Sequence, residues 1–261
     1  TANIDVSLGG RGAIAITITT SMADFGTIAV GTTSDTTVTF SNSGARPARS
    51  FAINSPQSPF SIISNNCGNS LAAGGLCSLG IRFAPVAPGQ FNPSLSATYE
   101  TGIGTASVGS SLRGTATVPI LLAVNGNHSC VRTEVGQLKC WGQNNYGQLG
   151  LGDSVNRGTS SDSQYGMGNN LPAVSLGTNR YPKAIALGYW HTCVIMDNDS
   201  VKCWGSNRYG QLGLGIADET VGTLPGSMGN ALSTIDLRGV AVALTGGYSH
   251  SCALMSTGDV K

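Results

Sequence analysis

Residues 191–215 read HTCVIMDNDSVKCWGSNRYGQLGLG, and this stretch decides the fold because the chain contains it more than once. Residues 128–152 repeat it as HSCVRTEVGQLKCWGQNNYGQLGLG, and residues 250–261 begin it again as HSCALMSTGDVK. The His-Ser/Thr-Cys, Cys-Trp-Gly and Gly-Gln-Leu-Gly-Leu-Gly segments keep the same offsets in the first two copies. Repetition of this density indicates one supersecondary unit copied along the chain.

Each copy reads as an antiparallel hairpin. Residues 183–196 and 200–204 are rich in apolar and β-branched side chains, which favours strands, and Asp197-Asn198-Asp199 supply a turn between them. Opposed positions in an antiparallel pair lie within reach of a disulfide, so the two cysteines of a copy fix the register. That register pairs Cys193 with Cys203, Val194 with Lys202, Ile195 with Val201 and, in the first copy, Val131 with Lys139.

Six of the seven cysteines fall into pairs that share one separation. None of them belongs to a Cys-x-x-Cys motif or a Cys/His cluster of zinc type, so we expect no metal site and no cofactor. A disulfide in each pair would add roughly 2.5–3 kcal/mol by restricting the unfolded chain, and such bonds persist in oxidising surroundings. We therefore expect an extracellular or cell-surface protein. The pairs are Cys67 with Cys77, Cys130 with Cys140 and Cys193 with Cys203, while Cys252 would face the position after Lys261.

The chain of 261 residues carries few charges. Asp, Glu, Lys and Arg make up 10% of it and the net charge is +1, whereas charged residues are roughly 25% of an average soluble domain. No electrostatic field therefore directs the protein to nucleic acid or to an anionic membrane. The longest apolar run, Val118 to Val124, is far shorter than the ~20 residues that span a bilayer. We expect no nucleic-acid partner and no membrane span.

The repeated motifs resemble the regulator-of-chromosome-condensation (RCC) repeat, and the resemblance covers about residues 119–261. It is carried by His-Ser-Cys-Ala-Leu, Val-Lys-Cys-Trp-Gly and Asn-x-x-Gly-Gln-Leu-Gly. It implies that residues 118–261 form blades of a β-propeller, stacked because a small sheet cannot bury its faces alone. Family propellers close with more blades than two copies and the start of a third. We therefore expect this chain to be incomplete at its C-terminus, as part of a longer chain or a multi-copy assembly.

Residues 13–117 differ from the repeats. Short alternating strands are broken by glycine turns, with a strand at 78–83 and a closing strand near 105–113, which suggests a β-sandwich. The pattern resembles the abnormal-spindle/Hydin-type immunoglobulin-like domain, common in arrays on bacterial surface proteins. Residues 1–12 echo the closing strand, so we expect the last strand of a preceding sandwich there. The predicted fold class is all-β, an immunoglobulin-like sandwich followed by a partial β-propeller.

The residues common to the copies are interpreted as structural, and no catalytic residue is predicted. His128, His191 and His250 are expected to be buried and to bond neighbouring backbone inside their own blades, because no carboxylate or serine keeps a fixed offset that would complete a triad. The glycine-rich segments lack the Lys-Ser/Thr of a phosphate loop and are expected to form positive-φ turns. Trp141 and Trp204 are expected to pack in the core beside the disulfides.

Binding residues are sought instead in the segments that vary between copies. The stretches 153–181 and 216–238 are polar and glycine-rich, and loops on a propeller face are where such folds bind their partners. Trp190 stands where the other copies have Asn127 and Ser249, so we expect it to be exposed. The candidate partner contacts are Arg157, Tyr165, Asn179, Arg180, Tyr181, Trp190 and Arg208.

These observations favour a structural or adhesive module of an extracellular bacterial surface or fibre protein, acting through a protein partner or self-assembly. The alternative is a secreted protein-binding propeller, since related bacterial propellers include a β-lactamase inhibitor. A third reading, nucleotide exchange on a small GTPase with chromatin binding, is disfavoured by the cysteine pairs and by the absence of a basic patch. An enzyme is the reading least favoured.

The common cysteine separation and the hairpin register of the repeats predict three disulfides, none of them between repeats. Peptide mapping of the unreduced protein should recover the links Cys67–Cys77, Cys130–Cys140 and Cys193–Cys203. A crossed link between two repeats would contradict the blade arrangement, and free thiols at all six positions would remove the argument for an oxidising compartment.

Overall fold

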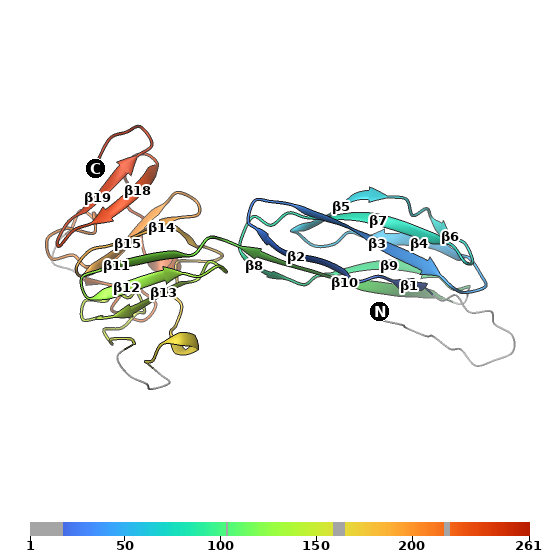
Figure 1. The fold of residues 1–261 in the computed structure, drawn as a ribbon, viewed down its shortest axis with the longest axis horizontal. Coiled ribbons are helices and arrows are strands. Elements are labelled where there is room, and N and C mark those ends of the chain that lie inside the picture. The colour runs from blue at the N-terminus through green and yellow to red at the C-terminus, as the bar shows by residue number, and fades with distance from the viewer. Residues whose placement is uncertain (1–17, 103, 159–164, 217–219) are drawn as a thin grey trace. The chain divides into compact units, whose positions relative to one another are not determined.

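The computed structural model describes residues 18–102, 104–158, 165–216 and 220–261, and Figure 1 shows its strands. The strand expected at residues 1–12 lies outside these ranges. The chain divides into two compact units, unit 1 (Thr1–Thr117) and unit 2 (Val118–Lys261). Both are built from strands, which confirms the all-β fold class.

Unit 1 is a sandwich of two sheets. One sheet has the order β1-β3-β7-β5, and the other has the order β2-β10-β9-β4-β6 with β8 also paired to β10. The strands are β1 (Ile18–Thr20), β2 (Ala23–Ala29), β3 (Ser34–Asn42), β4 (Ala48–Asn54), β5 (Phe60–Asn65), β6 (Ser70–Leu71), β7 (Leu76–Phe83), β8 (Gly89–Phe91), β9 (Ser94–Glu100) and β10 (Thr105–Thr117).

Alternation along the strands places one face of each sheet in the core. In β7, Leu79, Ile81 and Phe83 are fully buried while the residues between them are partly exposed. The rings of Phe25, Phe60 and Phe83 pack together, with centroids 4.7 Å apart for Phe60 and Phe83 and 5.2 Å for Phe25 and Phe60. Such side chains dominate the burial that stabilises a core.

The closing strand β10 is longer than the sequence suggested. It runs beyond residue 113 to Thr117 because its last residues pair in parallel with β2, Thr115 with Thr27 and Thr117 with Ala29. This pairing joins the first and last long strands of the unit. It could not be read from local pattern, because it links segments far apart in the sequence.

Unit 2 consists of three antiparallel repeats. Repeat 1 contains β11 (Leu121–Asn125), β12 (His128–Arg132) and β13 (Leu138–Gly142). Repeat 2 contains β14 (Pro182–Leu187), β15 (His191–Met196), β16 (Val201–Ser206) and β17 (Thr220–Val221), and repeat 3 contains β18 (Ala241–Gly246) and β19 (Ser251–Met255). Two short 3-10 helices, η1 (Gly168–Asn170) and η2 (Gly229–Ala231), precede repeats 2 and 3.

The hairpin register predicted from the cysteines is confirmed. Cys193 lies opposite Cys203 and Val194 opposite Lys202. The Cα atoms of Cys193 and Cys203 are 4.1 Å apart, the close spacing of a non-hydrogen-bonded antiparallel pair. The stretch 183–196 is two strands rather than one, because Gly188 turns the chain and donates its N–H to the carbonyl of His191.

The three repeats stack through their first strands. β11 lies beside β14, and β14 lies beside β18. The amide nitrogen Nδ2 of Asn125 donates to the carbonyl of Leu187 at 2.6 Å and to that of Gly246 at 3.2 Å, so one side chain of repeat 1 joins the strand ends of the other two. This radial stacking is the arrangement of propeller blades.

The loops after β13 and β16 give a matched pair for testing the glycine turns. Gly147 and Gly210 both have positive φ, +75° and +77°, but an added Cβ at Gly147 would lie 2.9 Å from the backbone of Gly222, whereas Gly210 faces open space.

We expect Gly210→Ala to cost about 1–2 kcal/mol through backbone strain alone. Gly147→Ala should cost roughly 1–3 kcal/mol more, because the backbone beside it cannot yield. Urea unfolding followed by tryptophan fluorescence measures this, since all three tryptophans lie in unit 2. Equal midpoints for the two variants would contradict the contact at Gly147.

Candidate functional site

The repeats are joined by a chain of polar contacts that runs from one blade to the next. Nε2 of His128 lies 2.9 Å from Oγ1 of Thr192 in repeat 2. That hydroxyl donates to the carbonyl of Gln148 in repeat 1 at 2.8 Å, so it accepts its other hydrogen bond from the imidazole. Nε1 of Trp204 donates to the same carbonyl at 3.1 Å. A buried carbonyl of repeat 1 thus accepts its hydrogen bonds from two side chains of repeat 2.

The same series of hydrogen bonds recurs between repeats 2 and 3. Nε2 of His191 lies 2.9 Å from Oγ of Ser251, and that hydroxyl donates to the carbonyl of Gln211 at 2.9 Å. The sequence-based prediction for the histidines is therefore wrong in two respects. His128 and His191 bond a hydroxyl of the next repeat rather than their own backbone, and His250 is exposed rather than buried. His128 and His191 thus join neighbouring repeats.

Burial fixes the charge of the two joining histidines. It lowers the pKa of His128 from about 6.5 to about 4, with a smaller effect from nearby His191, and it lowers the pKa of His191 to about 4, with a smaller effect from His250. Both imidazoles are therefore neutral near pH 7.

In the described part of the chain, no three His, Cys, Asp or Glu side chains cluster as metal ligands.

The two repeated tryptophans differ in burial. Trp204 is fully buried in the cluster that contains the Cys130–Cys140 disulfide, as predicted. Trp141 is only partly buried.

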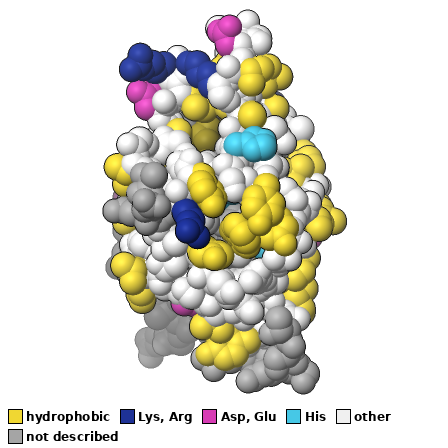
Figure 2. All heavy atoms as spheres, turned by 90° about the vertical axis from the view of Figure 1, so that its left-hand side faces the viewer, with side chains coloured by type: hydrophobic (Ala, Val, Ile, Leu, Met, Phe, Trp, Pro, Cys, Tyr) yellow, Lys and Arg dark blue, Asp and Glu magenta, His cyan; other side chains and the backbone are white. Residues whose placement is uncertain are grey.

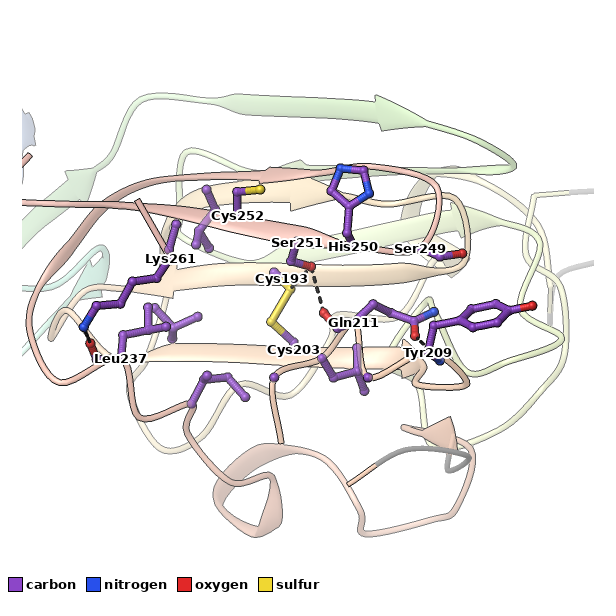
Figure 3. A pocket seen from close by; sticks show the side chains of 17 residues that line it. Cys193, Cys203, Tyr209, Gln211, Leu237, Ser249, His250, Ser251, Cys252 and Lys261 are labelled. Carbon is purple, nitrogen blue, oxygen red and sulfur yellow. Dashed lines mark hydrogen bonds between the residues drawn. A yellow bond between two sulfur atoms is a disulfide. The ribbon is translucent and has the colours of Figure 1, made fainter. Parts of the chain in front are cut away.

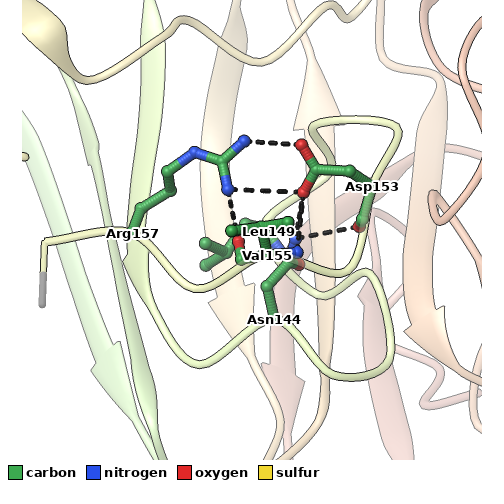
Figure 4. Close-up of polar contacts among 5 residues, drawn as sticks. All are labelled: Asn144, Leu149, Asp153, Val155 and Arg157. Atoms are coloured by element: carbon green, nitrogen blue, oxygen red, sulfur yellow. Dashed lines mark hydrogen bonds and ion pairs between the residues drawn. The ribbon is translucent and has the colours of Figure 1, made fainter. Parts of the chain in front are cut away.

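One predicted contact residue, Arg157, is not available to a partner. Its side chain is 6% exposed, and its Nη2 lies 2.5 Å from Oδ2 of Asp153. Oδ1 of Asp153 also accepts from Nδ2 of Asn144 at 2.9 Å, so the three side chains close the loop on itself (Figure 4). Tyr165 is partly buried, with its ring centroid 5.1 Å from the Arg157 guanidinium carbon. The prediction of Arg157 as a contact is corrected: it holds the loop.

The remaining predicted contacts lie at opposite ends of repeat 2. Arg180 forms an ion pair of 2.7 Å with Asp197, and the N–H of Tyr181 donates to the same carboxylate. Asn179 precedes them in a left-handed turn with φ of 56°. Trp190 lies at the other end of β15, and exposed Arg208 follows β16 with its guanidinium 5.9 Å from the ring centroid of Tyr209. The seven residues do not form one site.

An aromatic surface lies at the Trp190 end, and it consists of Tyr146, Tyr189, Trp190 and Tyr248. The ring centroids are 5.5 Å apart for Tyr146 and Trp190, 5.0 Å for Trp190 and Tyr248, and 4.6 Å for Tyr189 and Tyr248. Tyr248 is 57% exposed and Tyr146 is 37% exposed, while Tyr189 and Trp190 are partly buried. All three repeats contribute to it.

The turns between paired strands position these rings. Tyr189 and Trp190 lie in the β14–β15 turn, Tyr248 lies in the β18–β19 turn, and Tyr146 lies in the loop after β13. Figure 2 looks onto this end of unit 2, where hydrophobic side chains gather near the middle with a basic side chain and a histidine close by. Because the rings pack on one another, they are held in place before any partner arrives.

Sequence reasoning found Trp190 but missed the three tyrosines. A signal was present: Tyr146 recurs as Tyr209, and Tyr189 recurs as Tyr248, each at one offset from the repeated motifs. Strand periodicity does not indicate which turn residues of different repeats meet, so only the packed structure shows the cluster.

Comparisons with known proteins agree with this architecture. A family described as "Regulator of chromosome condensation (RCC1) repeat" matches residues 120–148 and 183–211, and a second family with the same description matches residues 136–195. The family "HYDIN/CFA65/VesB-like, Ig-like domain" matches residues 15–115. The chain therefore contains RCC1 repeats and a HYDIN/VesB-like immunoglobulin-like domain.

Individual relatives share only part of their length with the chain. The probable E3 ubiquitin-protein ligase HERC4 of Homo sapiens is 31% identical over 133 residues, which are 51% of this chain and 11% of HERC4. The ultraviolet-B receptor UVR8 of Arabidopsis thaliana is 32% identical over 140 residues, which are 54% of this chain and 28% of UVR8. Prp20p of Saccharomyces cerevisiae matches with 13% identity and a TM-score of 0.38, covering 76% of this chain and 56% of that protein.

No helix within the described ranges is long and apolar enough to cross a membrane.

The neutral histidines predict a loss of stability in mild acid. Their pKa is lower in the folded state than in the unfolded state, so unfolding takes up protons once the pH falls below about 6.5, and stability is greatest above that pH. With two such groups, stability should fall by up to about 2.7 kcal/mol per pH unit towards pH 4.

His128→Gln keeps an N–H donor for Thr192 and removes one titrating group. We expect this variant to lose about half of the slope between pH 6.5 and pH 5, a window above most carboxyl titration. Urea unfolding at a series of pH values measures it. A slope identical to that of the parent protein would show that His128 does not titrate on unfolding.

Proposed function

We propose that the chain is an extracellular, non-enzymatic protein-binding module of structural or adhesive kind, and that the aromatic surface contacts its partner. RCC1-like repeats are generally protein-interaction modules, which supports the class of function. The observation that carries the proposal is the cluster of Tyr146, Tyr189, Trp190 and Tyr248, half-exposed at one end of the repeats.

The cysteines support the extracellular part of the proposal. Three pairs are bonded, two of them across the hairpins of repeats 1 and 2, and the half-cystines of these two repeats are almost fully buried. Disulfides used as structural elements in this number are typical of oxidising compartments. In a reducing compartment the disulfides would open, and the protein would lose the stability that they give by restricting the conformations of the unfolded chain.

The chemistry of the aromatic surface supports recognition of a protein. Tyr and Trp are enriched among the few residues that dominate binding energy at protein interfaces, because they bury large areas with little loss of side-chain freedom. Their hydroxyl and indole N–H groups stay available to polar atoms of a partner. Few charges accompany them, so the matching surface would be apolar or aromatic with little net charge.

A second function uses the same surface. A secreted recognition module that blocks one foreign protein would also need a rigid aromatic patch, whereas an adhesive or fibre module would meet copies of itself. The identity of the bound protein separates the two functions.

The test is capture by the immobilised 1–261 chain from the extracellular fraction of its source, followed by affinity measurement on the protein recovered. Trp190→Ala and Tyr248→Ala should each weaken binding by about tenfold or more, as removal of an interface anchor does. Val135→Ala is the matched control, because Val135 is 38% exposed and lies in the β12–β13 turn at the opposite end of its repeat.

Recovery of further copies of the chain would identify an adhesive or structural module, and recovery of one foreign protein would identify an inhibitor-like module. Binding that survives both aromatic substitutions unchanged would exclude this surface as the contact.

A further inference from the structure

A polar cavity lies at the end of repeat 2 that is opposite the aromatic surface. It measures about 330 Å³, near the lower limit of the roughly 300–1,000 Å³ found for small-molecule sites. Three buried apolar side chains, two cationic side chains and five neutral polar side chains line it: Leu176, Met196 and Leu232; Arg180 and Lys202; and Asn198, Ser200, Asn230, Ser233 and Thr234.

Lys202 brings a buried positive charge to this cavity. The residue is 7% exposed, and its Nζ donates to the carbonyl of Gly229 at 2.6 Å and to that of Leu176 at 3.3 Å. Both acceptors are neutral, and no carboxylate of the described residues forms an ion pair with Lys202. Burial lowers the pKa of Lys202, and the nearby Arg180 lowers it further. A buried charge without a counter-charge is costly, so an anion in the cavity would be stabilised there.

Arg180 adds a second cation at the rim of the cavity. Its Nη1 donates to Oδ2 of Asp197 at 2.7 Å, and its side chain is 40% exposed. Nε and Nη2 have no acceptor among the described residues, so the guanidinium can donate to a second oxyanion. The planar guanidinium matches the paired oxygens of such a group.

The charges around the cavity leave one positive charge without a partner. Lys202 and Arg180 contribute two positive charges, and Asp197 balances one of them. The nearby Asp199 is already paired with Lys183. A ligand group with a single negative charge, such as a carboxylate or a sulfate ester, would neutralise the remainder. A phosphate monoester, with a charge near −2, would exceed it.

The lysine recurs in every repeat, but the arginine does not. Lys202 and its counterpart Lys261 each donate to the carbonyl of a leucine, which for Lys261 is Leu237 (Figure 3). The position of Arg180 is occupied by Gly239 in repeat 3. The architecture of the repeat therefore explains a lysine bonded to a carbonyl, and it does not explain a second cation beside that lysine.

Neutral donors surround the two cations, and a peptide strand has no place beside them. The hydroxyls of Ser233 and Thr234 and Nδ2 of Asn198 are hydrogen-bonded to no described residue. The edge of β16 next to the cavity is occupied, because Val201 pairs with Ile235. The lining therefore suits a compact ligand that carries hydroxyl groups as well as one negative charge.

We propose that this cavity binds an acidic sugar unit. Its carboxylate or sulfate ester would lie between Lys202 and Arg180, and its hydroxyls would bond the neutral side chains at the rim. A uronate and a sulfated sugar both supply the single negative charge that the cavity requires. The site is separate from the aromatic surface and does not rest on the function proposed for that surface.

The test is calorimetric titration of the full 1–261 chain with methyl glucuronide, glucose 6-sulfate and the uncharged methyl glucoside. We expect an acidic sugar to bind about tenfold more tightly than methyl glucoside, because its oxyanion accepts charge-assisted hydrogen bonds. The tighter of the two acidic sugars identifies the acid group. Equal affinity for methyl glucoside would overturn the proposal. N-acetylglutamate α-amide carries the same charge on a peptide unit, and equal affinity for it would overturn the assignment to a sugar.

Two substitutions at the rim should change this affinity in opposite directions. Arg180→Gln should weaken binding of the acidic sugar about tenfold, since a charge-assisted hydrogen bond is lost. Asp197→Asn should strengthen it several-fold, because Arg180 is freed while asparagine still accepts the N–H of Tyr181. Lys139→Gln is the matched control, since Lys139 is the counterpart of Lys202 in repeat 1 and does not line the cavity. Unchanged binding by Arg180→Gln, or weaker binding by Asp197→Asn, would contradict the proposed site.

Discussion

The carbonyl of Gln148 is the point on which the stacking of the repeats depends. It lies inside the contact between repeats 1 and 2, where water cannot satisfy it, and two donors of repeat 2 reach it: the Thr192 hydroxyl and the Trp204 indole. A buried carbonyl left without a partner would cost roughly 1–3 kcal/mol. The loop that presents the carbonyl and the strands that bond it are therefore stable only together. We therefore expect the repeats to fold as one stack rather than as independent hairpins.

The local structure serves that contact. Each hairpin is too small to be stable alone, and in repeats 1 and 2 a disulfide holds the register that sends alternate side chains to opposite faces. The glycine loop is shaped from within, since the amide of Asn144 accepts the N–H of Leu149 and donates to Asp153. Asn207 plays the same part in repeat 2, where it accepts the N–H of Leu212. Covalent and polar constraints thus prepare each loop for its neighbour.

The features that depend on residues close together in the sequence could be predicted, and the contacts between distant residues could not. The cysteine separation determined the register because the side-chain period of a strand is two, so one correct pair determines the others. The bonding of His128 was missed because its partner, Thr192, lies a full repeat away, although a Ser or Thr follows every repeated histidine. Arg157 was taken for a surface residue because its loop is polar, and its ion pair with Asp153 shows that a polar loop can bury its charges in pairs. The parallel pairing of β2 with β10 has no local signal at all.

Some positions are the same in every repeat because they form the contacts between repeats, and others differ and are free to contact a partner. The histidine and the hydroxyl residue after it recur in every repeat, because each contact requires both. The turn just before the histidine is less constant: Gly126 and Asn127 in repeat 1 correspond to Tyr189 and Trp190 in repeat 2 and to Tyr248 and Ser249 in repeat 3, so the tyrosine is shared by repeats 2 and 3 alone. These variable positions lie side by side because the constant ones hold the strand ends together. The stack thus brings side chains from turns that differ between repeats, together with the recurring Tyr146, onto one surface, which is how a repeated scaffold can present a specific binding site.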